Sequence, residues 1–135
     1  MTRILFLSFV MCAAACAPNI GDSCQTSADC SVNGSRICDL AQPGGYCTVG
    51  GCDPDTCPGS SLCVEWRGTP DRTAVTFCMD RCGGDGDCRR QYSCMGVGDP
   101  RIMEGDDPLA QIIDTSARRR EASFCVADPA LLGVE

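Results

Sequence analysis

Residues 24–47 read CQTSADCSVNGSRICDLAQPGGYC and contain four cysteines. Two further groups of four follow, and the first two gaps stay short in every group. The groups are Cys24, Cys30, Cys38 and Cys47; Cys52, Cys57, Cys63 and Cys78; and Cys82, Cys88, Cys94 and Cys125. The fourth cysteine always follows an aromatic residue (Tyr46, Phe77, Phe124), and the second follows Asp29, Thr56 or Asp87. This self-similarity predicts three tandem four-cysteine modules.

The cysteine content indicates the class of protein. The chain has 14 cysteines in 135 residues, about a tenth of the total, which is typical of a disulfide scaffold. Leu, Ile, Val and Phe are too few to hold such a chain together without covalent bridges. The sequence therefore predicts a small disulfide-rich fold.

Composition also excludes several kinds of chemistry. The chain has no His, and all 11 of its basic residues are Arg, so imidazole bases, Ser-His triads and Schiff-base lysines are absent. Ser60, Ser61 and Ser116 have no partner base. We therefore predict no catalytic residues and expect a protein that is not an enzyme. The net charge of −7 argues against a nucleic-acid partner.

The N-terminus has the regions of an export signal. Arg3 precedes an apolar run at residues 4–11, which is too short to span a bilayer, and small residues follow. Residues 13–16 read Ala-Ala-Ala-Cys and resemble the lipobox of bacterial lipoproteins, although Ala13 stands where Leu is usual. The resemblance implies that Cys16 receives a diacylglyceryl thioether, is exposed by cleavage and is then N-acylated.

Counting cysteines distinguishes the cleavage products. An ordinary signal peptidase cutting before Cys16 removes Cys12 and leaves an odd number, hence an unpaired thiol in an oxidising compartment. Lipidation of Cys16 leaves an even number for pairing. We therefore expect a signal peptide at residues 1–15, a lipidated Cys16 with a tether at 16–23, and anchoring in a bacterial outer membrane, because two or three acyl chains bind membranes stably. Plain secretion is the alternative, and a retained cytosolic chain is the remaining case.

The segments between the third and fourth cysteines have the pattern of β-hairpins. The paired segments are 37–40 with 46–49, 64–66 with 75–77, and 92–97 with 123–126. In the second hairpin apolar residues alternate on both sides of a Gly-Thr-Pro-Asp turn at 68–71. Three short hairpins are therefore expected.

The long insertion at residues 95–124 has the pattern of a helix near residues 107–121. Asp106 or Asp107 can cap its start, and Pro108 suits the first helical position. Leu109, Ile112, Ile113 and Ser116 fall on one face. The run Arg118, Arg119 and Arg120 would then lie near the negative end of the helix dipole.

Taken together, the spacing, the Asp-Cys and aromatic-Cys pairs and the signal resemble the cysteine-rich lipoproteins of the myxobacterial type, which carry EGF-like or Dickkopf-like modules. The resemblance implies an extracytoplasmic location. The interlocked bridges of EGF-like modules imply that the first cysteine of each group pairs with the third, and the second with the fourth. The expected modules span 24–51, 52–81 and 82–126, followed by a tail at 127–135.

Metal sites have to be weighed against disulfides and turns. Zinc is disfavoured because the chain has no Cys-x-x-Cys and no His, and because the signal points to an oxidising space. Acidic pairs that could bind calcium are Asp53 with Asp55 and Asp85 with Asp87. An EF-hand counted from Asp85 has Arg89 at its fifth position and Gly96 at its twelfth, so both ligands are missing. Asp and Gly also suit turns, and we expect no metal and no cofactor.

Function would depend on the loops between the third and fourth cysteines, which a rigid frame presents to solvent. We expect the protein to act as a binding or structural module, with loops 64–77 and 95–124 contacting a protein partner. The candidate contact residues are Trp66, Arg67, Ile112 and Ile113. Each of them also fits a local core.

An alternative function is a secreted protease inhibitor. Small disulfide modules can hold an exposed loop rigidly in a protease cleft. Arg67, or the run Arg118, Arg119 and Arg120, would then enter the specificity pocket of a trypsin-like enzyme. Against this, any charged loop of this chain contains Arg because Lys is missing, and the run also fits a helix end or contact with anionic lipid.

Overall fold

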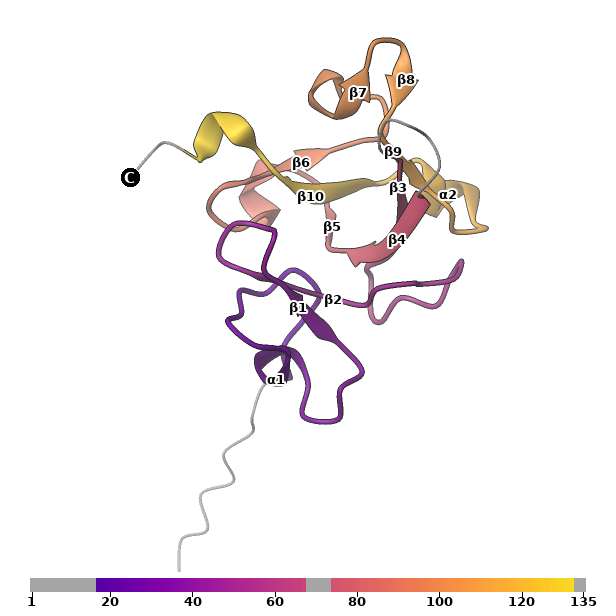
Figure 1. Cartoon of the computed structure of the whole chain (residues 1–135). Helices are drawn as coiled ribbons and strands as arrows, with labels where there is room; N and C mark the ends of the chain where they lie inside the picture. The colour runs from indigo at the N-terminus through magenta and orange to yellow at the C-terminus, as the bar shows by residue number, and fades with distance from the viewer. Residues whose placement is uncertain (1–16, 68–73, 133–135) are drawn as a thin grey trace, which may run out of the picture.

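The computed structural model describes residues 17–67 and 74–132 (Figure 1). These residues form short antiparallel strands and single helical turns held by six disulfides, so the predicted small disulfide-rich fold is confirmed. Within these two ranges no helix is long and apolar enough to cross a membrane. The predicted signal peptide, Cys16 and the turn at 68–71 lie outside the described residues.

The elements are all short, and η denotes a single turn of 3₁₀ helix. In chain order they are α1 (Ser27–Cys30), β1 (Ile37–Asp39), β2 (Tyr46–Thr48), β3 (Leu62–Arg67), β4 (Ala74–Met79), β5 (Arg81–Cys82), η1 (Asp85–Asp87), β6 (Tyr92–Met95), η2 (Pro100–Ile102), β7 (Met103–Glu104), β8 (Asp107–Pro108), β9 (Ala110–Ile112), α2 (Ala117–Arg120), β10 (Ser123–Ala127) and η3 (Pro129–Leu131). The strands of the described ranges form sheets of two or three strands.

Three hairpins have the pairing that the sequence predicts. They are β1 with β2, β3 with β4, and β6 with β10. In each, the third and fourth cysteines of a group lie opposite one another, as Cys38 and Cys47, Cys63 and Cys78, and Cys94 and Cys125. The spacing repeat is thus matched by a repeat in strand register.

The sheets combine strands from different cysteine groups. β9, from the third group, pairs with β3 of the second, giving the order β4-β3-β9. In the other three-stranded sheet β10 lies between β5 and β6. In Figure 1 the first group, drawn in indigo and purple, lies beside these two sheets. Three separate tandem modules are therefore not confirmed, because the second and third groups share a sheet.

A common hydrophobic core joins the groups. Its largest fully buried side chains are Tyr46, Leu62, Val64, Met79, Met95 and Phe124. Tyr46 comes from the first group, so every group contributes to this core. The first group also has a small cluster of its own around Cys30 and Cys47. The aromatic residue before the fourth cysteine is fully buried in the first and third groups, which explains that part of the sequence pattern.

The predicted helix near residues 107–121 is wrong for most of its length. Pro108 lies in β8 and the following residues form β9, so helix is confined to Ala117–Arg120. Ala110 and Ile112 are buried while Gln111 between them is exposed, which is the alternation of a strand. The spacing of the apolar residues fits a helix too, but pairing with β3 buries them in a strand.

The residue before the second cysteine has the same local role in each group. Its side-chain oxygen accepts a hydrogen bond from a backbone N–H three or four residues earlier, which closes the turn leading into that cysteine. The pairs are Asp29 with Thr26 at 2.8 Å, Thr56 with Asp53 at 3.1 Å, and Asp87 with Gly83 at 2.7 Å. The backbone donors of Gln25 and Thr26 also lower the pKa of Asp29.

Candidate functional site

Six disulfides form the frame on which any functional surface is built. They join Cys24 to Cys38, Cys30 to Cys47, Cys52 to Cys63, Cys57 to Cys78, Cys82 to Cys94 and Cys88 to Cys125. Every group thus pairs its first cysteine with its third and its second with its fourth, as the resemblance to EGF-like modules implied. The Cα–Cα distances of 5.3 to 6.0 Å are ordinary for disulfides.

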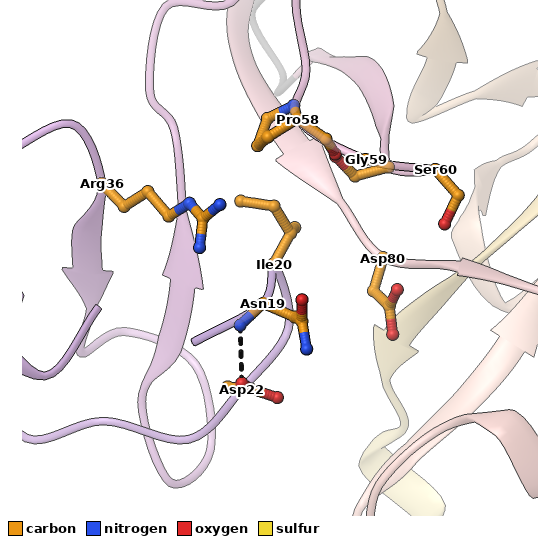
Figure 2. Close-up of a pocket in the computed structure, with 9 residues that line it drawn as sticks. Asn19, Ile20, Asp22, Arg36, Pro58, Gly59, Ser60 and Asp80 are labelled. Carbon is orange, nitrogen blue, oxygen red and sulfur yellow. Dashed lines mark hydrogen bonds between the residues drawn. The ribbon is translucent and has the colours of Figure 1, made fainter. Parts of the chain in front are cut away.

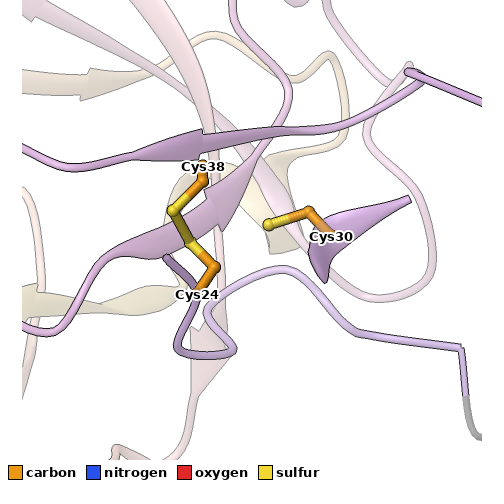
Figure 3. Close-up of side chains that lie close together, drawn as sticks. All are labelled: Cys24, Cys30 and Cys38. Atoms are coloured by element: carbon orange, nitrogen blue, oxygen red, sulfur yellow. A yellow bond between two sulfur atoms is a disulfide. The ribbon is translucent and has the colours of Figure 1, made fainter. Parts of the chain in front are cut away.

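Each group brings three sulfur atoms close together. In the first group Cys30 lies beside the bond between Cys24 and Cys38 (Figure 3). Similar clusters occur at Cys52, Cys57 and Cys63 and at Cys82, Cys88 and Cys125. Each of these sulfurs belongs to a disulfide, so none of them is a thiolate that could bind zinc. The clusters are junctions of interlocked bridges.

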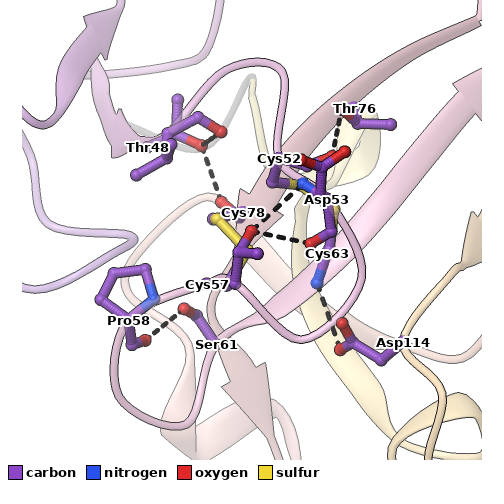
Figure 4. Close-up of a disulfide and its surroundings, with 12 residues drawn as sticks. Thr48, Cys52, Asp53, Cys57, Pro58, Ser61, Cys63, Thr76, Cys78 and Asp114 are labelled. Atoms are coloured by element: carbon purple, nitrogen blue, oxygen red, sulfur yellow. Dashed lines mark hydrogen bonds between the residues drawn. A yellow bond between two sulfur atoms is a disulfide. The ribbon is translucent and has the colours of Figure 1, made fainter.

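Threonine hydroxyls connect the surroundings of the second group's disulfides (Figure 4). Thr48 is fully buried and its Oγ1 donates to the Cys78 carbonyl at 2.7 Å, which links β2 to β4. Thr76 Oγ1 donates to the Cys52 carbonyl at 2.9 Å. Backbone bonds from Cys78 to Val49 and from Gly51 to Thr76 extend the same seam. The first and second groups are therefore joined by hydrogen bonds as well as by the core.

The aspartates considered for calcium mostly accept hydrogen bonds from the chain. Asp85 Oδ1 accepts from the Cys94 N–H at 2.8 Å, and Asp87 caps its own turn. The Asp55 carboxylate accepts from the N–H and hydroxyl of Thr115, and Asp53 is exposed beside it in the chain. This arrangement favours the structural interpretation of these residues, as turn and loop connectors.

Trp66 and Arg67 lie at the end of β3. The Trp66 ring is partly buried and meets Phe124 edge-on, with centroids 6.0 Å apart, so it mainly covers the core. The Arg67 side chain is 46 % exposed and forms an ion pair with Glu65 at 2.7 Å. Its backbone N–H donates to the Leu109 carbonyl at 2.8 Å. Arg67 is thus a surface charge on a hydrogen-bonded strand.

Ile112 does not lie on the surface. It is 2 % exposed and lies opposite Val64 in the pairing of β9 with β3, so the prediction that it contacts a partner is wrong. Ile113 is partly buried and packs against the same core. The exposed residues of the insertion are 98, 100–101, 104–108, 111, 115–118 and 120–121. A partner of this loop would meet mainly polar side chains there.

The arginine run is divided between surface and interior. Arg118 and Arg120 are exposed, whereas Arg119 Nε donates to the fully buried carboxylate of Asp114 at 2.9 Å. Arg119 also donates to the Ser61 carbonyl. The middle arginine therefore holds α2 against the second group.

Asp114 is a buried acceptor for two segments of the chain. Its Oδ1 accepts from the Asp55 N–H at 2.8 Å. Its Oδ2 accepts from the Cys63 N–H at 3.3 Å, as Figure 4 shows. Arg119 supplies the compensating charge that a buried carboxylate needs. The resulting network fastens the insertion to the loop between Cys52 and Cys63.

Arg89 fastens the third group to the first. Its Nη2 donates to the Pro43 carbonyl at 3.1 Å, to the Gly45 carbonyl and to Tyr92 Oη. The guanidinium carbon lies 4.5 Å from the centroid of the Tyr92 ring and 5.9 Å from that of Tyr46. Burial raises the pKa of both tyrosines, so each phenol is neutral at physiological pH.

The segment expected to be a tether is partly folded. Ile20 is buried, the Gly21 N–H donates to the Cys47 carbonyl at 2.9 Å, and the Cys47 N–H donates to the Asp22 carbonyl at 2.9 Å. Arg36 donates to the Pro18 carbonyl. The tether predicted at 16–23 is therefore shorter, because residues 19–22 pack along β2.

A polar cleft of about 270 Å³ lies between this segment and the loop at residues 58–61 (Figure 2). Its charged residues are Asp22, Arg36 and Asp80, with Arg36 and Asp80 on opposite sides. The cleft has the size of a small binding site, but its wall is mixed in charge and holds no nucleophile with a base partner. It offers polar contacts to a small ligand.

Three residues with central positions were not singled out from the sequence. Asp114, Arg89 and Asp80 each connect segments that are far apart along the chain. No local motif marks them, since their neighbours in sequence differ and the bonds that connect the segments reach partners far away in the chain. The Asp-Cys and aromatic-Cys patterns, by contrast, were visible because they repeat.

Comparison of the chain with protein-family models, with curated proteins and with solved structures gives no match.

Proposed function

We propose that this chain is an extracytoplasmic lipoprotein, anchored through Cys16, whose disulfide frame serves as a binding or structural module. The observation that carries the proposal is the complete pairing of the cysteines at positions 24–125. The two others in the sequence are Cys12, inside the signal-like segment, and Cys16, after the small residues. Because every cysteine of the frame is paired with another, Cys16 is left for a separate role.

The folded segment at residues 19–22 bears on how such an anchor would act. Only two described residues, Ala17 and Pro18, precede it. A lipid on Cys16 would therefore hold the first cysteine group close to the membrane surface. The second and third groups would extend the loops at 64–77 and 95–124 from that base.

The three groups are best described as repeats of one unit that have merged into a common core. They share the disulfide pairing, the strand register of the third and fourth cysteines, and the side-chain acceptor before the second cysteine. The segments between the third and fourth cysteines differ most in length among the groups. Such a frame tolerates variation in the loops while the cystines stay in place.

The protease-inhibitor alternative has less support from the geometry. The backbone of Arg67 is engaged with β4 and with Leu109, whereas an inhibitory loop must offer an extended backbone to the protease. Arg118 and Arg120 lie in a helical turn. We therefore keep the binding or structural module as the proposed function.

The test is intact-mass analysis of the mature protein, combined with membrane fractionation. We expect a chain that starts at Cys16, carries acyl groups, and is twelve hydrogens lighter than its reduced form, two for each of six disulfides. Cys16→Ser should remove the acyl mass and release the protein from membranes, whereas Cys12→Ser should leave both unchanged. A wild-type mature chain without acyl mass would refute the anchor.

A further inference from the structure

Asp80 lies where the three cysteine groups meet. It follows the last residue of β4, and its backbone N–H donates to Tyr46 Oη at 2.8 Å. Its carbonyl accepts from the Cys125 N–H at 2.9 Å. One residue between β4 and β5 is therefore bonded both to the first group and to the third.

The Asp80 carboxylate has two neighbours of the same charge. Asp22 and Asp87 line the same cavity of about 110 Å³, Asp22 from the segment before the first group and Asp87 from η1. Both are held in place, because Asp22 accepts from the Asn19 N–H at 2.7 Å and Asp87 from the Gly83 N–H at 2.7 Å. The charges of Asp22 and Asp87 therefore act on Asp80 from carboxylates that are themselves held by hydrogen bonds.

The two arginines that line the cavities around Asp80 bond mainly to backbone carbonyls, and the buried Nε of Arg89 makes no hydrogen bond to the described residues. Arg89, which lines the same cavity, donates hydrogen bonds from its Nη2 to the carbonyls of Pro43 and Gly45 and to Tyr92 Oη. Arg36, across the larger cleft, bonds the Pro18 carbonyl. The set facing Asp80 consists of Asp22, Arg36, Tyr46, Asp87, Arg89 and Tyr92, with Arg81 next in the chain.

Contact with Gly21 leaves the carboxylate little room. A Cβ added at Gly21 would lie 2.8 Å from the Asp80 Cβ and 3.3 Å from its Oδ2. Burial raises the pKa of Asp80, and the charges of Asp22 and Asp87 raise it further, against one hydrogen bond from the Arg81 N–H. The folded protein therefore binds a proton at Asp80 more tightly than a state in which the contacts around Asp80 are open.

We propose that Asp80 is a proton-sensitive joint between the first cysteine group and the rest of the protein, closed more tightly when its carboxyl is protonated and loosened by repulsion from Asp22 and Asp87 when it is ionised. The sign follows from linkage. A raised pKa in the closed state contributes stability that is fully present at low pH and is lost as the pH rises through that pKa. If the proposed anchor at Cys16 holds the first group, the joint also sets how firmly the other two groups are attached to that anchor.

The test is amide hydrogen exchange of the full mature, oxidised protein at about pH 4.5 and about pH 7.5. The reporters are the N–H of Asp80 and the N–H of Cys78, which donates to Val49 across the same boundary. We expect protection factors, which are corrected for intrinsic exchange, to be about three- to tenfold higher at the lower pH. In Asp80→Asn, a neutral isostere, protection should stay high at both pH values.

Asp106→Asn is the matched control, because it removes one exposed carboxylate on the distant β7–β8 turn and should keep the wild-type pH dependence. As a measurement that needs no variant, the ¹³C shift of the Asp80 carboxyl in the wild type should titrate with a midpoint above the ordinary value of 3.8. The proposal would be overturned if protection in the wild type did not depend on pH, or if Asp80→Asn kept the wild-type pH dependence. A titration midpoint of the Asp80 carboxyl at or below 3.8 would overturn it as well. None of these readouts depends on the lipid anchor.

Discussion

Gly45 passes so close to Cys24 that a larger residue has no space there. A Cβ at Gly45 would lie 2.1 Å from the Cys24 carbonyl oxygen, and the φ of +69° is one that glycine adopts freely. This contact lets the turn before Tyr46 lie against the first cysteine. At the residue scale, the first group is thus shaped by the absence of a side chain as much as by its disulfides.

We predict that Gly45→Ala destabilises the oxidised protein by about 3 kcal/mol or more, because backbone overlap adds to the cost of a left-handed residue. Gly34→Ala is the control. Gly34 has a similar φ of +73° but nothing within 4 Å of an added Cβ, so its cost should be about 1 kcal/mol. Denaturant unfolding at fixed pH measures both. Equal costs at the two positions would show that the close approach to Cys24 has no energetic weight.

The strand β9 is the element in which tertiary contacts overrule the local pattern. Its three residues add an edge to the β4-β3 hairpin and place Ile112 in the core opposite Val64. The ion pair of Asp114 with Arg119 follows directly and holds the chain beyond the strand. This element thereby joins the third group to the second.

Ile112→Ala should cost about 2 to 4 kcal/mol, because it deletes buried methyl and methylene groups from a packed core. Ile37→Ala provides the matched comparison, since Ile37 is 43 % exposed on β1, and its cost should stay near or below about 1 kcal/mol. Chemical denaturation of the two oxidised variants gives the comparison. If Ile112→Ala lowered the free energy of unfolding no more than Ile37→Ala does, the pairing of β9 with β3 would be in doubt.

For the whole molecule, titrating carboxylates make stability fall both at low pH and at higher pH. Hydrogen bonds from Arg101 lower the pKa of Asp99 to about 2, and hydrogen bonds from Ser93 and Ala130 lower that of Asp128. Lowered values contribute stability above the ordinary pKa of 3.8 that is lost as the pH falls below it. Asp80 acts in the opposite sense. Stability should therefore fall on the acid side as Asp99 and Asp128 take up protons, and on the alkaline side of the Asp80 titration as that carboxyl ionises.

The acid side of this profile can be tested on Asp99→Asn. Between about pH 4 and about pH 2 the wild type should lose stability, seen as a falling denaturant midpoint, and the variant should lose less because Asp99 no longer takes up a proton. Asp106→Asn should follow the wild type, since Asp106 is exposed on the β7–β8 turn. A variant whose acid limb is as steep as that of the wild type would exclude Asp99 as a contributor.

Much of the framework was predictable because its causes are local or repeated. The hairpin positions follow from alternation around turns, and the disulfide class follows from composition. The aspartate and aromatic residues beside the cysteines close a turn or fill the core in nearly every group. The pairing of the cysteines came from a resemblance rather than from their spacing, because the spacing alone left several connectivities open.

The remaining features depend on contacts between distant residues. Asp114 binds a segment 59 residues away, Arg89 one 46 residues away, and Asp80 one 34 residues away. No window of sequence contains both partners, and the apolar spacing at 109–113 fits a helix and a strand alike. The sequence by itself thus determined which cysteines and turns make the frame, because these are set within each group. Only the tertiary structure decided how the groups merge, since that depends on which buried surfaces and charges meet across the chain.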